Sequence, residues 1–600
     1  MPLCPFLQEE AGAMKKGLRN PRVGFSPSCL WGGPNRLVIA GGGLMLVGID
    51  VGGTFTDGVL YGNGRILESV KTPTEDDNLQ ETIITVLDDL LRGRKGEDIR
   101  RLVLSTTLVT NLLAAGQGDE VALILIPGPG LNLRQLQFFP QAHIIKGATD
   151  FHGRITEALD GEEVRELGQK IVAAGIEKVA VVGKFSQRNQ RQEGQVEEIL
   201  LARHPHLKVV KGFGVAGELN FPRRAVTTYY TAMTQDAWGE FAASIKRALV
   251  QRGITSPIDI LKADGGTMPL EASLNSPCET IFSGPAASVM GALALTMDEQ
   301  TAVVVDMGGT TTDLALILQG KPLHASRGAM LGGYYSHVRS LALRSLPLGG
   351  DSAVRWTGEE ISLGPDRLGP AACFGGPVAT PTDAVNFLAG GHLGPLSLSQ
   401  EALARVAHPA GLKTETLAQD LVGQVIEVLK DSIKEMFKSW EEEPAYRIWE
   451  IVNKQRVKAQ RLVGIGAAAQ AFVPILAKEV GCPAFVDHYS PVANALGAAV
   501  SRPTLSLQVH ADTRQGSYYL SLDGIVGRCK GDLQLADVKD LARKHLRQLA
   551  AQRGIGQYAD RSEVFLAEQF NMVRGWSTTG KLFDVGIKIA PGVIDDYKGV

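Results

Sequence analysis

Two segments of the chain carry the same order of apolar and polar positions. Each begins with an apolar run, at Val47–Ile49 or Val303–Val305, which is typical of a buried strand. An Asp, a Gly-Gly pair, hydroxyl residues and a second Asp follow before another apolar run starts. Glycine pairs between apolar runs favour a tight turn, so each segment is predicted to form a β-hairpin.

The polar residues of both hairpins suit phosphate binding. Glycines let backbone N–H groups approach an anion, Thr hydroxyls add donors, and an Asp can hold Mg²⁺ through water. One copy alone could be a Gly-rich turn between core strands, but the recurrence favours two loops that grip the phosphates of one nucleotide from opposite sides. The predicted nucleotide-binding residues are Asp50, Gly52, Gly53, Thr54 and Thr56 in the first hairpin and Asp306, Gly308, Gly309, Thr310, Thr311 and Thr312 in the second, with Asp50 and Asp306 as magnesium ligands.

The paired hairpins resemble the phosphate-1 and phosphate-2 loops of the actin, sugar-kinase and heat-shock-chaperone ATPase superfamily. After the first hairpin, helical and strand patterns alternate, which is typical of an α/β protein. Helices are predicted at Asn78–Leu91, Leu417–Lys438, Arg447–Lys458 and near Leu535–Leu549, and strands at Leu102–Leu104, Val121–Ile126, Val179–Val182 and Phe583–Ile589.

Composition narrows the function classes. A chain of 600 residues is too long for one core, so two or more domains are expected. The net charge of −3 and the 6% aromatic content do not indicate a nucleic-acid partner. No apolar stretch is long enough to span a membrane. The six cysteines are far apart and form no Cys-x-x-Cys, so a reducing cytoplasm fits best.

Residues 1–44 differ from the rest of the chain. They are rich in Gly, Pro and scattered basic residues and show no sustained period. A secretory signal is rejected, because the apolar run after Arg36 continues into the strand that ends at Asp50. We interpret residues 1–44 as the result of a start codon assigned too early, with Met45 as the true first residue, or as a disordered extension.

Further motifs identify a family. The run Ser105-Thr-Thr-Leu-Val-Thr-Asn111 and the first hairpin resemble the N-terminal half of the hydantoinase A and 5-oxoprolinase family. Its other motifs are matched, in order, by Asp264–Met268, Thr280–Ser288, Leu348–Ser352, Gly364–Pro370, Gly375–Ala384, Leu462–Ala468 and Val492–Ala499. The resemblance covers roughly residues 45–502.

This resemblance implies two ribonuclease-H-like lobes with nucleotide between them. We predict an N-terminal lobe at 45–235, a hydantoinase A lobe at 236–503 and a small α+β appendage at 504–600. The Asn494–Ala499 run matches the connecting helix of the superfamily, so it is assigned to packing and hinge motion. Gly464 and Gly466 resemble the adenosine motif, although a close strand–helix turn would also need glycines.

Three other motifs keep two interpretations each. In Thr380-Pro-Thr-Asp383, Asp383 could reach a polar substrate, or the segment could be a plain turn. Arg367 could stabilise developing negative charge or only fix its loop. The Gly349–Ser352 segment could cap a helix or contact phosphate.

The family resemblance implies ATP-dependent opening of a cyclic amide, such as a hydantoin or 5-oxoproline. Phosphoryl transfer to the lactam oxygen would give an imidate phosphate that water can attack, and the protein would mainly position groups and neutralise charge. Asp57 or Asp313 would orient water or substrate. Two alternatives remain: a subunit of an ATP-dependent carboxylase, and a non-enzymatic reactivating or chaperone-like factor. A separate B-type subunit is expected as a partner.

Overall fold

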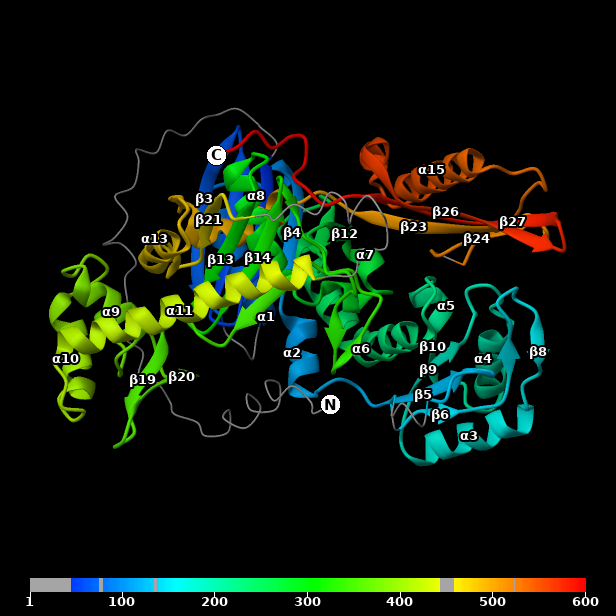
Figure 1. The fold of residues 1–600 in the computed structure, drawn as a ribbon, viewed down its shortest axis with the longest axis horizontal. Coiled ribbons are helices and arrows are strands. Elements are labelled where there is room, and N and C mark those ends of the chain that lie inside the picture. The colour runs from blue at the N-terminus through cyan, green and yellow to red at the C-terminus, as the bar shows by residue number, and fades with distance from the viewer. Residues whose placement is uncertain (1–44, 75–78, 134–137, 140, 443–457, 523) are drawn as a thin grey trace.

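The computed structural model describes residues 45–600 except 75–78, 134–137, 140, 443–457 and 523. The interpretation of residues 1–44 and nearly all of the helix predicted at Arg447–Lys458 lie outside the described residues. The predicted α/β fold of two lobes with an α+β appendage is confirmed (Figure 1).

The first lobe is built on a six-stranded sheet. Its order is β12 (Thr267–Pro269), β11 (Ile258–Leu261), β4 (Ile99–Thr106), β1 (Met45–Val51), β2 (Phe55–Gly62) and β3 (Arg65–Pro73). Strands β4 and β11 run parallel to β1, whereas β2 is antiparallel to it. Because parallel strands end at the same edge, the carboxyl ends of β1, β4 and β11 meet on one side of the lobe.

The second lobe repeats this plan. Its sheet runs β15 (Lys321–Pro322), β14 (Thr312–Leu318), β13 (Ala302–Met307), β21 (Arg461–Ile465) and β22 (Ala484–Phe485), and β18 (Leu343–Leu346) also pairs with β14. Strand β14 is antiparallel to β13, and β21 is parallel to it. Each lobe therefore places an antiparallel hairpin beside a parallel strand, which is the ribonuclease-H-like arrangement.

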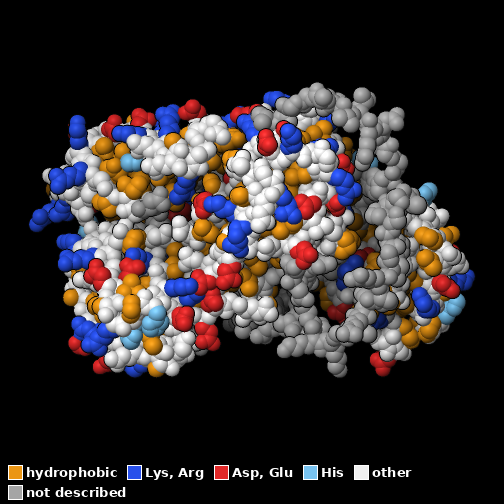
Figure 2. Space-filling model, turned by 180° about the vertical axis from the view of Figure 1, so that it is seen from behind, with side chains coloured by type: hydrophobic (Ala, Val, Ile, Leu, Met, Phe, Trp, Pro, Cys, Tyr) orange, Lys and Arg blue, Asp and Glu red, His pale blue; other side chains and the backbone are white. Residues whose placement is uncertain are grey.

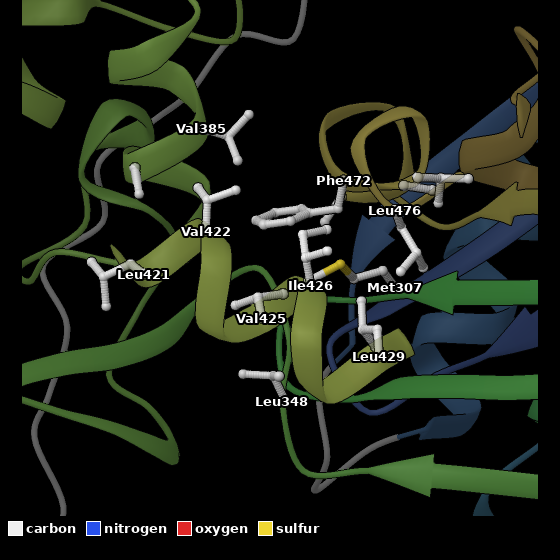
Figure 3. Close-up of a cluster of buried hydrophobic side chains, with 14 of the residues drawn as sticks. Met307, Leu348, Val385, Leu421, Val422, Val425, Ile426, Leu429, Phe472 and Leu476 are labelled. Atoms are coloured by element: carbon white, nitrogen blue, oxygen red, sulfur yellow. The ribbon is translucent and has the colours of Figure 1, made fainter. Parts of the chain in front are cut away.

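Apolar stripes explain the helix layer of the second lobe. Helix α11 (Thr414–Glu441) buries an apolar face that includes Val422, Val425 and Ile426 against Phe472 of α13 (Ala469–Val480) and Met307 of β13 (Figure 3). Helices α9 (Pro381–Leu388) and α10 (Leu396–Ala407) continue this layer toward one end of the molecule (Figure 1). Met307 at the end of β13 packs into this layer, next to Asp306 in the sequence.

Two helices rich in small residues pack closely against each other and against the first sheet. Helix α14 (Ala493–Val500) packs on β1 so closely that a Cβ at Gly48 would lie 2.0 Å from the Ala495 carbonyl oxygen. It also contacts α8 (Ser283–Thr296), where a Cβ at Gly291 would lie 2.2 Å from the Ala493 oxygen. Only glycine permits these approaches, so the helices join the two lobes with almost no intervening side chain.

One predicted boundary is wrong. The division at 235/236 falls inside α6 (Phe221–Gln251), and β11 and β12 belong to the first sheet because β11 pairs with β4. The first lobe also carries an insert with its own parallel sheet. This sheet contains β10 (Lys208–Lys211), β9 (Lys178–Gly183), β5 (Val121–Ile126) and β6 (His143–Ile144), covered by α3 (Gly161–Ala173) and α4 (Arg191–Arg203).

The C-terminal appendage is a separate layer. Its sheet runs β25 (Val526–Arg528), β24 (Ser517–Leu520), β23 (Leu505–Asp512), β27 (Ser577–Ile589) and β26 (Ser562–Arg574), packed against α15 (Leu535–Gln552). The appendage and the insert lie at the same end of the molecule (Figure 1), and Gln190 Nε2 donates a 3.0 Å hydrogen bond to the Gly524 oxygen between them.

The surface carries charges of both signs. Basic and acidic side chains are interspersed over the face shown in Figure 2, so this face presents no electrostatic field of a single sign.

Among the described helices, none combines the length and the apolar character needed to cross a bilayer.

Candidate active site

The two duplicated segments form hairpins with the same strand register and the same turn hydrogen bond. In the first, Asp50 pairs with Asp57 across β1 and β2, and in the second Asp306 pairs with Asp313 across β13 and β14. Both turns are closed by the same hydrogen bond of 3.0 Å: Gly52 N–H donates to the Phe55 oxygen, and Gly308 N–H donates to the Thr311 oxygen. The sequence repeat is therefore a repeat of backbone geometry.

The carboxylates of the two hairpins meet at the lobe junction. Asn494, on the first turn of α14, donates from Nδ2 to Asp50 Oδ2 and to Asp306 Oδ2, each at 3.3 Å. One amide thus bridges the two lobes. The sequence assigned the run that contains Asn494 to packing and hinge motion, whereas the structure places its side chain between the two candidate magnesium ligands.

Burial dominates the electrostatics of this cluster. It raises the pKa of Asp50 to about 7, opposed by the Ser105 hydroxyl and reinforced by the charge of Asp57. Burial, followed by the charge of Asp306, raises the pKa of Asp313 to about 7. The pKa of Asp306 is also raised by burial. Asp50 is buried, and Asp306 and Asp313 are half-buried. Carboxylates that crowd together away from solvent are stabilised by a cation, which is a property of metal and phosphate sites.

Two further side chains support the carboxylates and were not predicted. Lys71 on β3 donates from Nζ to Asp57 Oδ1 at 2.6 Å, and Ser288 on α8 donates to Asp306. Lys71 is on the strand next to Asp57, so only the register of β2 and β3 shows the contact. Ser288 follows the Ser-Gly-Pro-Ala segment, whose first residue, Ser283, donates a 3.0 Å hydrogen bond to the Thr106 oxygen at the end of β4. This hydrogen bond joins the family motif at Ser105–Asn111 to the family motif at Thr280–Ser288.

The glycines at the turn tips are open to a ligand to different extents. Gly53 is exposed, and a Cβ built there meets no atom within 4 Å. Gly309 is more enclosed, since its Cβ would lie 2.6 Å from Asp351 Oδ2 and 3.2 Å from Arg367 Nε. Thr54, Thr310 and Thr311 are half-buried beside these turns.

The other two predicted threonines have different partners. The Thr56 hydroxyl is fully buried and lies 3.0 Å from Thr74 Oγ1, while Thr312 donates to the Leu348 oxygen at 2.6 Å. Both hydroxyls are therefore directed into the protein. They hold the hairpins to their neighbours, and the prediction that they donate to phosphate is replaced by this supporting role.

The Gly349–Ser352 segment braces the second hairpin. Gly350 N–H donates to the Gly308 oxygen at 2.9 Å, and Asp351 N–H donates to the Gly309 oxygen at 2.8 Å. Arg367 donates from Nε to Asp351 Oδ2 at 3.1 Å, with its side chain 25% exposed. Arg367 thus lies beside the Gly309 turn, which keeps it close to any phosphate bound there and also ties down its loop.

Asp383 has a structural role. It is fully buried at the start of α9, where it forms a capping box with Thr380. Its oxygens accept hydrogen bonds from the backbone of Ala372 at 2.9 Å and of Cys373 at 2.8 Å, and from Ser399 at 2.9 Å. A carboxylate with all these donors cannot also reach a substrate, so the catalytic prediction for Asp383 is wrong.

Gly464 and Gly466 differ in their surroundings. A Cβ at Gly464 would lie 2.9 Å from Val486 and 3.0 Å from Val473, so this glycine serves strand–helix packing. Gly466 has a φ of +87°, and its Cβ would lie 2.6 Å from Asp306 Oδ1. Of these two glycines, Gly466 borders the carboxylate cluster and Gly464 does not.

The junction suits Mg²⁺ with a triphosphate. Asp50 Oδ1 and Asn494 Oδ1 are buried without a hydrogen-bond partner among the described residues. Oxygen atoms are the ligands that Mg²⁺ prefers. Within the described ranges, no three His, Cys, Asp or Glu side chains converge as a metal site. Mg²⁺ often takes only one or two carboxylates and fills its other positions with water and phosphate oxygens, so a pair of carboxylates such as Asp50 and Asp306 fits this ion.

A two-lobed fold with duplicated hairpins and ordered family motifs defines the class of protein. The chain belongs to the hydantoinase/oxoprolinase family, which confirms the resemblance found from sequence. Residues 46–203 match the N-terminal region of the family, and residues 224–506 match the hydantoinase/oxoprolinase region that follows.

Relatives with known names are similar over part of their length. The caprolactamase alpha subunit of Pseudomonas jessenii is 25% identical over 481 residues, which are 72% of this chain and 67% of the relative. The 5-oxoprolinase of Saccharomyces cerevisiae is 25% identical over 538 residues, 76% of this chain and 41% of that protein. This chain thus spans about two thirds or less of these relatives.

A solved structure shares the fold. The nucleotide-free structure of acetone carboxylase superposes with a TM-score of 0.68 at 18% identity, covering 93% of this chain and 89% of that chain. At this identity the likeness shows the fold alone.

Proposed function

We propose that this chain hydrolyses ATP to open a cyclic amide, such as a hydantoin, 5-oxoproline or a similar lactam. The observation that carries the proposal is the pair of matched hairpins whose carboxylates are bridged by Asn494 at 3.3 Å. Relatives named caprolactamase and 5-oxoprolinase support a lactam as the substrate. A separate B-type chain is proposed as a partner, because the caprolactamase relative is named as a subunit.

Each part of the site has a proposed task. Asp50 and Asp306 hold Mg²⁺, which neutralises phosphate charge, and the turns at Gly52–Thr54 and Gly308–Thr311 offer backbone N–H groups to phosphate oxygens. ATP supplies the γ-phosphoryl group that activates the lactam carbonyl. Asp57, fixed by Lys71, and Asp313 orient water or the lactam. Arg367 stabilises negative charge beside Gly309.

Substrate-stimulated ATP turnover tests this proposal. The protein, alone and with a co-expressed B-type chain, is incubated with Mg-ATP and a panel of 5-oxoproline, caprolactam, hydantoin and 2-pyrrolidinone. We expect one of these cyclic amides to raise ADP release, with one ring-opened product per ADP by mass spectrometry: an amino acid from a lactam, or an N-carbamoyl amino acid from hydantoin. Acetone or acetophenone with bicarbonate forms a second arm. Carboxylated product in that arm, and no ring opening in the first, would contradict the lactam proposal.

The cellular location is also a proposal. Cys278, Cys373, Cys482 and Cys529 are all free thiols in the described part of the chain. We propose a reducing compartment, the cytoplasm, for this protein.

A further inference from the structure

A polar cavity of about 280 Å³ lies where three parts of the chain meet. Its wall combines the start of α6 and the β11–β12 turn, the segment between β15 and β18, and strands β23, β26 and β27 of the appendage. None of its lining residues belongs to the candidate active site. A cavity of this size is near the lower limit for ligand pockets, so it suits a small molecule.

The carboxylates of the cavity are already neutralised. Glu218 accepts a 2.8 Å hydrogen bond from Arg339 and lies 3.6 Å from His337 Nδ1. Asp264 accepts from Thr504 Oγ1 at 3.0 Å and pairs with Lys262 Nζ at 3.2 Å. With these partners in place, neither carboxylate is available to hold a cation in the cavity.

Positive charge in the cavity is less completely matched. The Arg223 guanidinium lies 5.8 Å from the Tyr335 ring centroid and forms no ion pair with any carboxylate of the described residues. Lys588 Nζ is 3.4 Å from Glu563, whose side chain is 49% exposed and therefore a weak partner. An excess of basic groups in a recessed space attracts an anion.

The rest of the wall favours an organic anion. Phe565 and Pro591 line the cavity and are half-buried, so they offer apolar surface for a carbon skeleton. The planar guanidinium of Arg223 presents parallel N–H donors that match a carboxylate. We propose that this cavity binds a small organic carboxylate, with Arg223 and Lys588 as its charged anchors. The ligand would contact both lobes and the appendage, so it would fasten the appendage to the body of the protein.

Binding without nucleotide tests this proposal independently of ATP turnover. Isothermal titration and thermal melting are run with malonate, malonamide and inorganic phosphate. Malonamide keeps the three-carbon skeleton of malonate without its charge, so the pair isolates the charge, and neither compound is a lactam that the candidate active site is proposed to take. We expect malonate to bind and to raise the melting temperature, while malonamide does neither.

Two variants locate the site. Arg223→Gln and Lys588→Gln should each weaken carboxylate binding about tenfold or more, because each removes one anchor. Arg247→Gln, at an exposed position of the same helix α6, is the matched control and should bind like the wild type.

Several results would overturn the inference. They are no malonate binding by the wild type, equal binding of malonamide, preference for inorganic phosphate over malonate, or an unchanged affinity in both Arg223→Gln and Lys588→Gln. Lactam-stimulated ATP turnover can persist in each of these cases, so failure here is separate from failure of the proposed function.

Discussion

The substitution Gly53→Val is expected to weaken phosphate binding without destabilising the fold. A Cβ at Gly53 meets no protein atom within 4 Å, and surface changes of this kind usually alter stability by less than about 0.5 kcal/mol. The valine side chain would instead occupy the space of a phosphate held by the first hairpin. If two charge-assisted hydrogen bonds of about 1.5 kcal/mol each are lost, affinity falls by about 3 kcal/mol, or roughly 100-fold.

The assay is isothermal titration with a non-hydrolysable ATP analogue and Mg²⁺, beside thermal melting without ligand. Gly423→Val is the control, because Gly423 is an exposed position of α11 whose Cβ also meets no atom within 4 Å. Gly309→Val is a poorer probe, since its Cβ would lie 2.6 Å from Asp351 Oδ2 and folding would suffer together with binding. Wild-type affinity in Gly53→Val would refute the phosphate role of the first hairpin.

Asn494→Ala removes the amide that donates 3.3 Å hydrogen bonds to Asp50 and Asp306. ATP turnover should fall at least about tenfold, which is a rise of about 1.4 kcal/mol in the activation free energy. Turnover at the wild-type rate would contradict a bridging role for Asn494. Asp306→Ala should abolish ATP hydrolysis with little loss of melting temperature. Burial raises the pKa of the Asp306 carboxyl, so its charged form does not stabilise the fold. Retained hydrolysis would show that Asp306 is not part of the site. Against the effect of burial, His337 and Arg339 lower the pKa of Glu218 from 4.5 to about 2. The charged Glu218 therefore stabilises the fold above pH 4.5, and this stabilisation is lost as the pH falls toward 2. In urea unfolding, the free energy of unfolding that Glu218→Gln removes should be larger at pH 6 than at pH 3. An equal loss at the two pH values would disprove this linkage.

Local patterns predicted the hairpins well. An apolar run, an Asp and a Gly-Gly pair determine strand, turn and return within fourteen or so residues, so the geometry at Asp50 and Asp306 could be read without tertiary information. The family motifs then gave the two lobes. The capping box at Thr380 and Asp383 was also local, with Pro381 at the first helical position, and the spacing Thr-x-x-Asp was the available signal for it.

The remaining site residues depend on tertiary packing. Asn494 is far from both hairpins in sequence and sits in a run of small residues, so its place between Asp50 and Asp306 follows only from the close crossing of α14 with β1. Lys71 reaches Asp57 through strand register. The boundary inside α6 was missed because β11 returns to the first sheet after the insert, and such long-range pairing leaves no local pattern.

A crystal structure of the protein with a non-hydrolysable ATP analogue and Mn²⁺, which uses the anomalous signal of the metal, would show whether the two lobes share one nucleotide. We expect the β- and γ-phosphates between the turns at Gly53 and Gly309, with the metal beside Asp50 and Asp306, directly or through water. Nucleotide bound elsewhere, or held by one hairpin alone, would contradict the claim that the two lobes grip a single ATP.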